Sequence, residues 1–191
     1  MEAIILAGGL GTRLRSVISD MPKSMAPISG HPFLSLLLYN LSLKGFKRAI
    51  LSVGYKYADI KRFFGKSFHE LDLHYVIENE PLGTGGAIRS SLKHINSDHA
   101  HVFNGDTFID LDFDSIESLW KTHKKTIVSI TEVPDTYRYG KVIESNGLIL
   151  DFVEKGNRGR GLINCGAYVF GKNELNRCTP SLIICSYRLE R

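Results

Sequence analysis

Apolar residues follow two spacings in the first two thirds of the chain. Short apolar runs at Ala3–Ala7, Arg48–Val53 and Leu73–Ile77 are bounded by polar or glycine-containing segments, as is typical of buried strands. Between them, apolar positions recur three and four residues apart, as on one face of a helix. This alternation predicts a parallel sheet built from β-α-β units. Helices are expected at 33–44, 57–64, 84–92 and 113–124, and further strands at 101–104 and 126–133.

Residues that start and stop helices support these boundaries. Pro32 precedes the first amphipathic stretch and Gly45 follows it, an order that suits the two ends of a helix. Gly65 is expected to end the second helix. Thr84, in the loop ENEPLGTGG (78–86), is expected to cap the start of the third.

The pattern changes after Tyr139, where short β-like segments follow one another without helices between them. They lie at 139–144, 148–155 and 162–170, and Asn146-Gly147 is a strong signal for a two-residue hairpin turn. We therefore expect an α/β fold, with a Rossmann-like, mostly parallel sheet flanked by helices and a small β-rich lobe near the C-terminus. No repeat or long linker divides the chain, so a single domain over 1–191 is expected.

A glycine-rich turn follows the first strand, at Gly8, Gly9 and Gly11. Glycine permits a sharp turn and a close approach of the backbone to a ligand, and successive amide N–H groups in such a turn can hold an anion. Arg13 and Lys23 add two positive charges behind it. A polyphosphate is therefore the expected ligand.

Two well-known phosphate-binding loops do not fit this stretch. A dinucleotide fingerprint that starts at Gly9 needs a third glycine where the chain has Leu14. A Walker loop needs glycine before Lys-Ser, but Pro22 precedes Lys23 and has no N–H to donate. The turn is therefore a phosphate loop of another type.

An acidic residue is expected at the same edge of the sheet. The strand expected at 101–104 is followed by Gly105-Asp106-Thr107. Ligands of doubly wound sheets bind beyond the carboxyl ends of the strands, so Asp106 should face the same crevice as the glycine-rich turn.

The order and spacing of these residues resemble those of the sugar-phosphate nucleotidyltransferases, also called sugar-nucleotide pyrophosphorylases. GGLGTRLR (8–15) followed by PKSMAPI (22–28) is similar to the family pattern G-G-x-G-T-R-L and then P-K-x-M/L. NGDTF (104–108) is similar to the motif whose Asp holds magnesium in that family. The stretch SDMPKSMAPISGHPFL (19–34) most resembles the small bacterial guanylyltransferases that act on D-glycero-D-manno-heptose 1-phosphate.

The resemblance implies a GT-A-like fold and a Mg²⁺-dependent enzyme. Such an enzyme would transfer GMP from GTP to D-glycero-D-manno-heptose 1-phosphate, giving pyrophosphate and a nucleotide sugar for capsule or lipopolysaccharide synthesis. A uridylyl- or thymidylyltransferase of the same family is the alternative enzyme. The resemblance also divides the chain into a nucleotide-binding half (1–135), a sugar-binding lobe (136–178) and an atypical tail (179–191).

The resemblance also assigns roles to single residues. Arg13, Lys23 and Asp106 are the expected catalytic residues, with Asp106 as the metal ligand. The sugar phosphate is expected near Gly140, Glu154, Lys155 and Asn164, although Glu154-Lys155 alone would also suit an ordinary solvated ion pair. The nucleotide is expected to contact Leu6, Ala7, Gly8, Gly9, Gly11, Thr12, Pro81, Gly83 and Thr84.

This chemistry explains why the sequence shows no Ser-His-Asp or Cys-His constellation. A sugar 1-phosphate has a second pKa of about 6, so it is largely ionised near neutral pH and needs no general base. Transfer at phosphorus then depends mainly on positioning and electrostatics.

The C-terminal tail departs from the family pattern. Relatives usually supply a second metal-binding Asp far downstream, but TPSLIICSYRLER (179–191) contains no Asp. Its apolar part, 182–185, could form a short strand or be ill ordered. A shortened or frame-altered chain is therefore considered, and a catalytically impaired nucleotide-binding protein is the alternative from a different functional class.

Composition adds limits on partners and location. Three cysteines without C-x-x-C spacing indicate free thiols. The formal charge of +4 without a dense basic cluster suits anionic substrates and gives little support for nucleic-acid binding. Without a long apolar run or a leader, the expected location is the cytoplasm with no membrane partner, and a homo-oligomer is compatible with the sequence.

His99 and His101 could be two ligands of a metal ion, but the sequence shows no third ligand. The two histidines are therefore expected in a surface loop.

Overall fold

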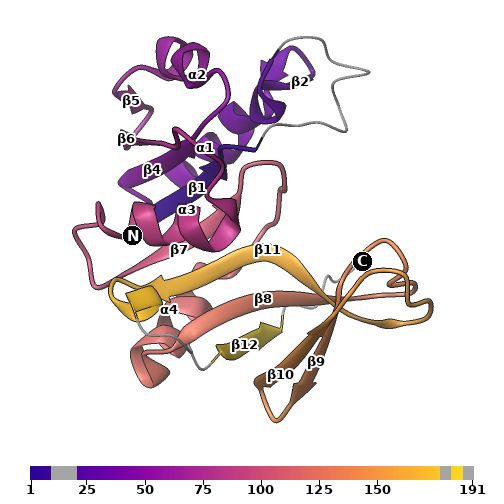
Figure 1. Cartoon of the computed structure of the whole chain (residues 1–191). Helices are drawn as coiled ribbons and strands as arrows, with labels where there is room; N and C mark the ends of the chain where they lie inside the picture. Colours follow the sequence, from indigo (N-terminus) through magenta and orange to yellow (C-terminus); the bar gives the residue numbers. More distant parts are fainter. Residues whose placement is uncertain (10–20, 177–181, 187–191) are drawn as a thin grey trace. The chain divides into compact units, whose positions relative to one another are not determined.

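The computed structural model describes residues 1–9 and 21–176 and the backbone of residues 182–186. The chain divides into two compact units, Met1–Phe108 and Ile109–Arg191 (Figure 1). The functional boundary expected at 135/136 stays a prediction. Within the described ranges, no helix is long and apolar enough to cross a membrane.

The sheet of the first unit has the strand order β5-β6-β4-β1-β7. β1 runs parallel to β4 and β7, and β4 runs parallel to β6, whereas the short β5 is antiparallel to β6. Ile4 lies in register between Ile50 and Val102, and all three side chains are buried. The predicted parallel sheet is confirmed. The strands are β1 (Glu2–Ala7), β4 (Arg48–Val53), β5 (Ser67–Phe68), β6 (Leu71–Ile77) and β7 (His99–Asn104).

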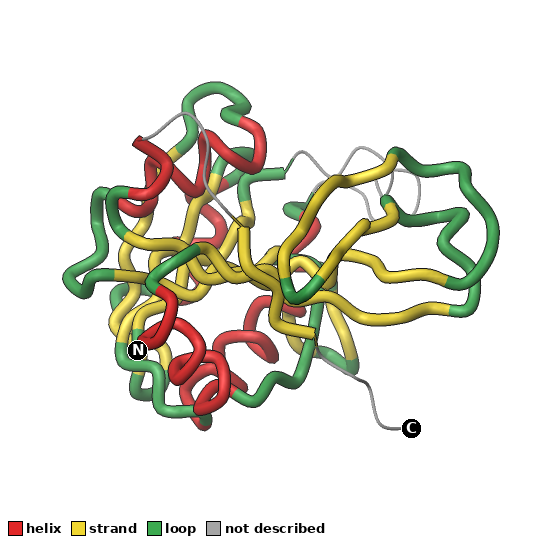
Figure 2. Tube along the Cα trace, turned by 90° about the horizontal axis from the view of Figure 1, so that it is seen from below, coloured by secondary structure: helices red, strands yellow, loops and turns green. Residues whose placement is uncertain are grey.

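Helices connect these strands in the sequence, and Figure 2 colours the helices red and the strands yellow. The leucines of α1 at positions 34, 37, 38 and 41 are buried, as their spacing predicts. α3 packs against β1, β4 and β7. The helices are α1 (Phe33–Leu43), α2 (Tyr57–Phe64) and α3 (Gly83–Leu92), and a short 3-10 helix, η1 (Lys23–Met25), precedes α1.

Three local expectations for this unit were wrong or incomplete. Thr84 is not the cap of α3, because the helix starts at Gly83, whose positive φ of 66° makes the turn without a capping side chain. His99 and His101 lie in β7, which confirms the strand expected at 101–104 and corrects the surface-loop expectation for the two histidines, and His101 is only 2% exposed. A small hairpin of β2 (Pro27–Ile28) and β3 (His31–Pro32) escaped prediction because each strand has only two residues.

The second unit is rich in antiparallel strands. β11 (Gly161–Gly171) runs alongside β8 (Thr126–Val133) in Figure 1 and also pairs with β9 (Lys141–Ser145). β9 and β10 (Leu148–Val153) form the predicted hairpin, with positive φ at both Asn146 and Gly147. The unit also contains α4 (Phe113–His123), η2 (Glu174–Asn176) and β12 (Leu182–Ser186). β12 pairs with β8 in parallel, so the apolar part of the tail forms a strand.

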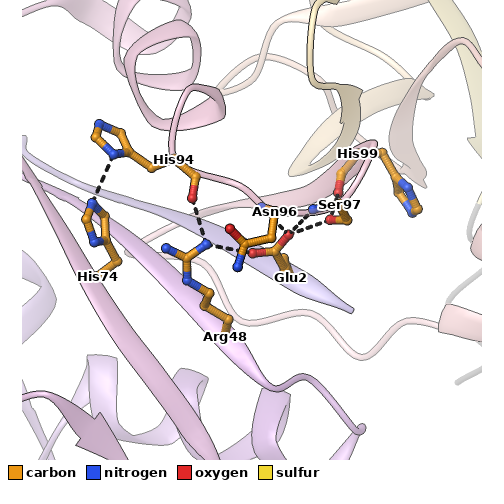
Figure 3. Close-up of polar contacts among 7 residues, drawn as sticks. All are labelled: Glu2, Arg48, His74, His94, Asn96, Ser97 and His99. Atoms are coloured by element: carbon orange, nitrogen blue, oxygen red, sulfur yellow. Dashed lines mark hydrogen bonds and ion pairs between the residues drawn. The ribbon is translucent and has the colours of Figure 1, made fainter.

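A polar network joins the amino ends of β1 and β4 to the turn between α3 and β7 (Figure 3). Arg48 Nη1 donates to Glu2 Oε1 at 2.9 Å and to the His94 carbonyl oxygen at 2.7 Å. Glu2 Oε2 accepts hydrogen bonds from the Asn96 amide, the Ser97 amide and the Ser97 hydroxyl at 2.8, 2.6 and 2.5 Å. Burial alone would raise the pKa of Glu2, but these bonds outweigh it and hold the pKa below its ordinary value.

Replacing Glu2 with glutamine is expected to lower the free energy of unfolding at pH 7 by about 1–3 kcal/mol, because the hydrogen-bonded carboxylate is lost. A carboxyl group with a lowered folded pKa stabilises the protein above its unfolded pKa, and this contribution disappears as the pH falls through the folded pKa. The difference between wild type and E2Q in urea denaturation should therefore shrink below about pH 4.5. A difference that stays constant between pH 7 and pH 3 would contradict this account.

Candidate active site

A cavity of about 460 Å³ opens at the carboxyl end of the first unit's sheet. It lies among the ends of β1 and β7, the loop after β6 and the first turn of α3. Its volume is that of a small-molecule site, and ligands of open α/β sheets bind at this edge. The lining residues are Leu6, Gly8, Gly9, Glu78, Pro81, Gly83, Thr84, Ala87, Asn104 and Asp106.

Most of the residues predicted to contact the nucleotide come together in this cavity. Leu6, Gly8, Gly9, Pro81, Gly83 and Thr84 line it, together with the predicted metal ligand Asp106. Ala7 is only 7% exposed and does not line it. Gly11, Thr12 and Arg13 lie outside the described residues, so their predicted roles stay predictions.

Two glycines allow the backbone to pack closely at the cavity wall. A Cβ atom on Gly8 would lie 2.3 Å from Glu78 Oε1. A Cβ atom on Gly105 would lie 2.7 Å from the Leu6 carbonyl oxygen and 3.2 Å from Ala7 Cα. The Gly105 amide donates to that same Leu6 oxygen at 2.9 Å, so the ends of β1 and β7 are held together just before Asp106.

Lys23 and Asp106 form an ion pair although they are 83 positions apart in the sequence. Lys23 Nζ contacts Asp106 Oδ2, and Thr107 Oγ1 donates to Asp106 Oδ1 at 3.2 Å. The two side chains are 41% and 37% exposed, so both can exchange partners with a ligand. The pair brings an ammonium group and a carboxylate, both predicted to be catalytic, to the same cavity.

Glu78 lines the cavity, but the sequence did not identify it as a site residue. The Ser52 hydroxyl donates to Glu78 Oε1 at 2.8 Å, and the Leu82 amide donates to Oε2 at 3.4 Å. These bonds hold the carboxylate beside Gly8. One signal could have identified Glu78. It directly follows the strand β6, much as Asp106 follows β7, and ligands of such sheets bind beyond the carboxyl ends of the strands.

The predicted sugar-phosphate residues lie in the second unit, at one end of its β9-β10-β11 strands. Lys141 pairs with Val153 of β10 and with Ile163 of β11. Gly140, Glu154 and Asn164 therefore lie next to one another at this strand end, and Lys155 follows. Glu154 and Lys155 are exposed. The grouping agrees with a shared site, but the binding role stays a prediction.

Asn164 is already engaged within β11. Its Nδ2 donates to the Tyr168 hydroxyl at 2.9 Å, and its Oδ1 accepts from the Gly166 amide at 2.8 Å. Burial raises the pKa of the neighbouring Cys165 thiol to about 11, so this free cysteine stays protonated near neutral pH. The geometry therefore gives no support for Cys165 as a nucleophile.

Comparisons with known proteins agree with this geometry. A family model described as nucleotidyl transferase matches residues 2–180. The D-glycero-alpha-D-manno-heptose 1-phosphate guanylyltransferase of Campylobacter jejuni is 45% identical over 92% of this chain and 78% of that protein. The enzyme of the same name from Aneurinibacillus thermoaerophilus is 40% identical over 90% and 75%. A crystal structure of HddC from Yersinia pseudotuberculosis complexed with GMP-PN has a TM-score of 0.83 and 36% identity, covering 97% of this chain and 90% of that one.

Proposed function

Because the chain belongs to the nucleotidyl transferase family, we propose that it transfers GMP from GTP to D-glycero-α-D-manno-heptose 1-phosphate. The products are a GDP-heptose and pyrophosphate. The observation that carries this proposal is the cavity lined by Gly8, Gly9, Glu78 and Asp106, at which Lys23 pairs with Asp106. The names of the two guanylyltransferases and the GMP-PN complex support the choice of nucleotide and sugar.

Glu78 supports guanine as the base. Guanine presents two adjacent donors, N1–H and the exocyclic amino group, which match the two oxygens of a carboxylate. Uracil and thymine present one N–H between two carbonyl oxygens, and these oxygens would face the carboxylate unfavourably. Ser52 holds Glu78 without using all of its acceptor positions, so the carboxylate can still accept hydrogen bonds from a base.

The reaction follows from the charges of the reactants. An ionised oxygen of the sugar 1-phosphate attacks the α-phosphorus of GTP, and the bond from this phosphorus to the β-phosphate oxygen breaks. The electron pair of that bond leaves with pyrophosphate. Lys23 stabilises the charge that develops on the phosphate oxygens, and amides of the glycine-rich turn hold the triphosphate. No side chain has to remove a proton from the attacking phosphate.

The residues present fit a magnesium ion. Asp106 is partly exposed at the cavity and offers hard carboxylate oxygens, and Mg²⁺ is commonly held by one or two carboxylates together with substrate phosphates. Asp106 would hold the ion, which when bound neutralises phosphate charge and orients the triphosphate. Lys23 would then exchange Asp106 for a phosphate oxygen.

The sugar 1-phosphate is placed near the exposed Glu154 and Lys155. Lys155 offers a positive charge for the attacking phosphate, and Glu154 can accept hydrogen bonds from sugar hydroxyls. The nucleotide heptose that results is the activated form that a glycosyltransferase of surface polysaccharide synthesis would consume.

Pyrophosphate release with Mg²⁺ tests this proposal across GTP, UTP, dTTP and ATP, each combined with heptose, mannose and glucose 1-phosphates. GTP with the manno-heptose 1-phosphate should give the highest kcat/KM. Preferential turnover of UTP or dTTP would replace the guanylyl assignment, and tight GTP binding without product from any pair would favour a silent nucleotide-binding protein.

Replacing Glu78 with glutamine is expected to lower kcat/KM for GTP by about 10- to 100-fold, because one oxygen acceptor becomes an amide donor that faces guanine donors. The amide oxygen can still accept the Ser52 hydroxyl, so the melting temperature should change little. Glu80→Gln is the matched control, since Glu80 is exposed in the same loop and does not line this cavity. If the two variants have the same kcat/KM for GTP, Glu78 does not recognise the base.

A further inference from the structure

Buried hydrogen bonds join a turn and a loop in the second unit. The turn, 135–137, follows β8, and the loop, 154–160, connects β10 to β11. Thr136 lies at the centre of the turn and is only 1% exposed, although its side chain is polar. Its hydroxyl donates to the Asn157 carbonyl oxygen at 2.8 Å and to the Gly159 carbonyl oxygen at 3.2 Å. The hydroxyl is therefore satisfied only while the loop keeps this conformation.

The loop carries Lys155, and its backbone is fixed on both sides of this residue. Before Lys155, the Glu154 carbonyl oxygen accepts a hydrogen bond from Asn157 Nδ2 at 3.2 Å. After Lys155, the Gly156 amide donates to the Tyr137 carbonyl oxygen at 3.1 Å. The path of the backbone at Lys155 therefore depends on Asn157 and on the turn.

We propose that Thr136 is a positioning residue for the sugar 1-phosphate. This inference rests on the proposed function, in which Lys155 binds the attacking phosphate and Glu154 binds sugar hydroxyls. Thr136 holds the backbone of Asn157, and the side chain of Asn157 holds the backbone of Glu154. Lys155 is thereby presented from a fixed backbone, which reduces the conformational entropy that is lost when the phosphate binds.

The far end of the loop has anchors that do not involve the Thr136 hydroxyl. The Gly159 amide donates to Asp135 Oδ1 at 3.1 Å, and the Gly159 carbonyl oxygen accepts from the Thr136 amide at 3.0 Å. Arg160 Nε and Nη2 donate to the two carboxylate oxygens of Glu132 at 2.7 and 2.6 Å. Removing the hydroxyl leaves these bonds in place, so it should loosen the first half of the loop without releasing β11.

Thr136→Val tests the proposal, because valine keeps the shape of the side chain but cannot donate a hydrogen bond. At saturating GTP and Mg²⁺, the KM for D-glycero-α-D-manno-heptose 1-phosphate should rise about tenfold, as expected for one lost buried hydrogen bond. The KM for GTP should stay as in the wild type, because residues of the first unit line the nucleotide cavity. Thr136→Ser keeps the hydroxyl and should restore the wild-type KM for the sugar phosphate.

Thr126→Val is the matched control. Thr126 is the first residue of β8, at the other end of this strand from the turn, and it is 0% exposed. Its hydroxyl has no hydrogen-bond partner among the described residues, and its amide, which valine keeps, donates to Glu174 Oε1 at 2.9 Å. This variant should have the wild-type KM for both substrates. Equal KM values for the sugar phosphate in Thr136→Val and Thr126→Val would overturn the proposal.

A binding measurement without turnover separates this inference from the proposed function. With GDP in place of GTP, so that no pyrophosphate can form, the heptose 1-phosphate should shift the amide NMR signal of Gly156. Thr136→Val should raise the Kd from this titration about tenfold, whereas Thr126→Val should leave it unchanged. An unshifted Gly156 signal in the wild type, or equal Kd values for the two variants, would overturn the inference. If these Kd values differ as expected but the wild type makes no product from GTP, only the proposed transfer reaction is wrong.

Discussion

Replacing Lys23 with methionine is expected to lower kcat/KM for nucleotidyl transfer by about 10²–10³-fold, the usual cost of one preorganised group that stabilises developing charge. Lys23 places its ammonium group on Asp106 at the cavity, where the triphosphate is expected to bind. Methionine keeps much of the apolar length of the side chain, so the change removes charge more than packing. Steady-state pyrophosphate release with saturating Mg²⁺ gives the measurement.

Lys66→Met is the control for a general effect of lost positive charge, because Lys66 is exposed and lies outside the cavity. Lys23→Arg should restore only part of the activity, since a planar guanidinium group does not replace a compact ammonium at one phosphate oxygen. If Lys23→Met and Lys66→Met have the same kcat/KM, Lys23 has no catalytic role.

Replacing Gly105 with alanine is expected to lower both the stability and the activity. The new methyl group would meet two backbone atoms of β1, the Leu6 carbonyl oxygen at 2.7 Å and Ala7 Cα at 3.2 Å, which cannot rotate away as a side chain can. Overpacking of this kind costs about 1–3 kcal/mol of folding free energy. The shift also moves the adjacent Asp106, so kcat should fall even at temperatures where the variant is fully folded.

Gly85→Ala is the matched control for the Gly105 variant. Gly85 lies within α3, and nothing lies within 4 Å of the position of a Cβ atom there. Alanine is favoured over glycine inside a helix, so this variant should be as stable as the wild type or more stable by about 0.5–1 kcal/mol. Equal melting temperatures and equal activities for Gly105→Ala and Gly85→Ala would show that the close approach of β7 to β1 is unimportant.

The sequence predicted regular elements well where a single periodicity dominated. The bounds of β4, α2 and β8 agree with the predicted ranges, because each element has a clear apolar pattern. Prediction failed where local backbone conformation, and not an apolar periodicity, determined the structure. At the start of α3, the positive φ of Gly83 replaced the expected Thr84 cap, and the two-residue strands of β2 and β3 are too short to give a pattern.

Those parts of the site that follow from the topology of the parallel sheet were predictable. Gly8 and Gly9 after β1 line the same cavity as Asp106 after β7, because neighbouring parallel strands end at the same edge. Glu78 was missed because a single glutamate in a polar loop carries no periodic signal. The surface-loop expectation for His99 and His101 conflicted with the strand expected at 101–104, and the strand was correct, with His101 buried.

The most direct test of the central claim follows the α-phosphate of GTP. The purified chain is incubated with Mg²⁺, D-glycero-α-D-manno-heptose 1-phosphate and GTP radiolabelled either at the α-phosphate or at the γ-phosphate. Our account predicts that the α label appears in a GDP-heptose and the γ label in pyrophosphate, in equal amounts. Absence of α label from any sugar product, although GTP binds, would contradict it.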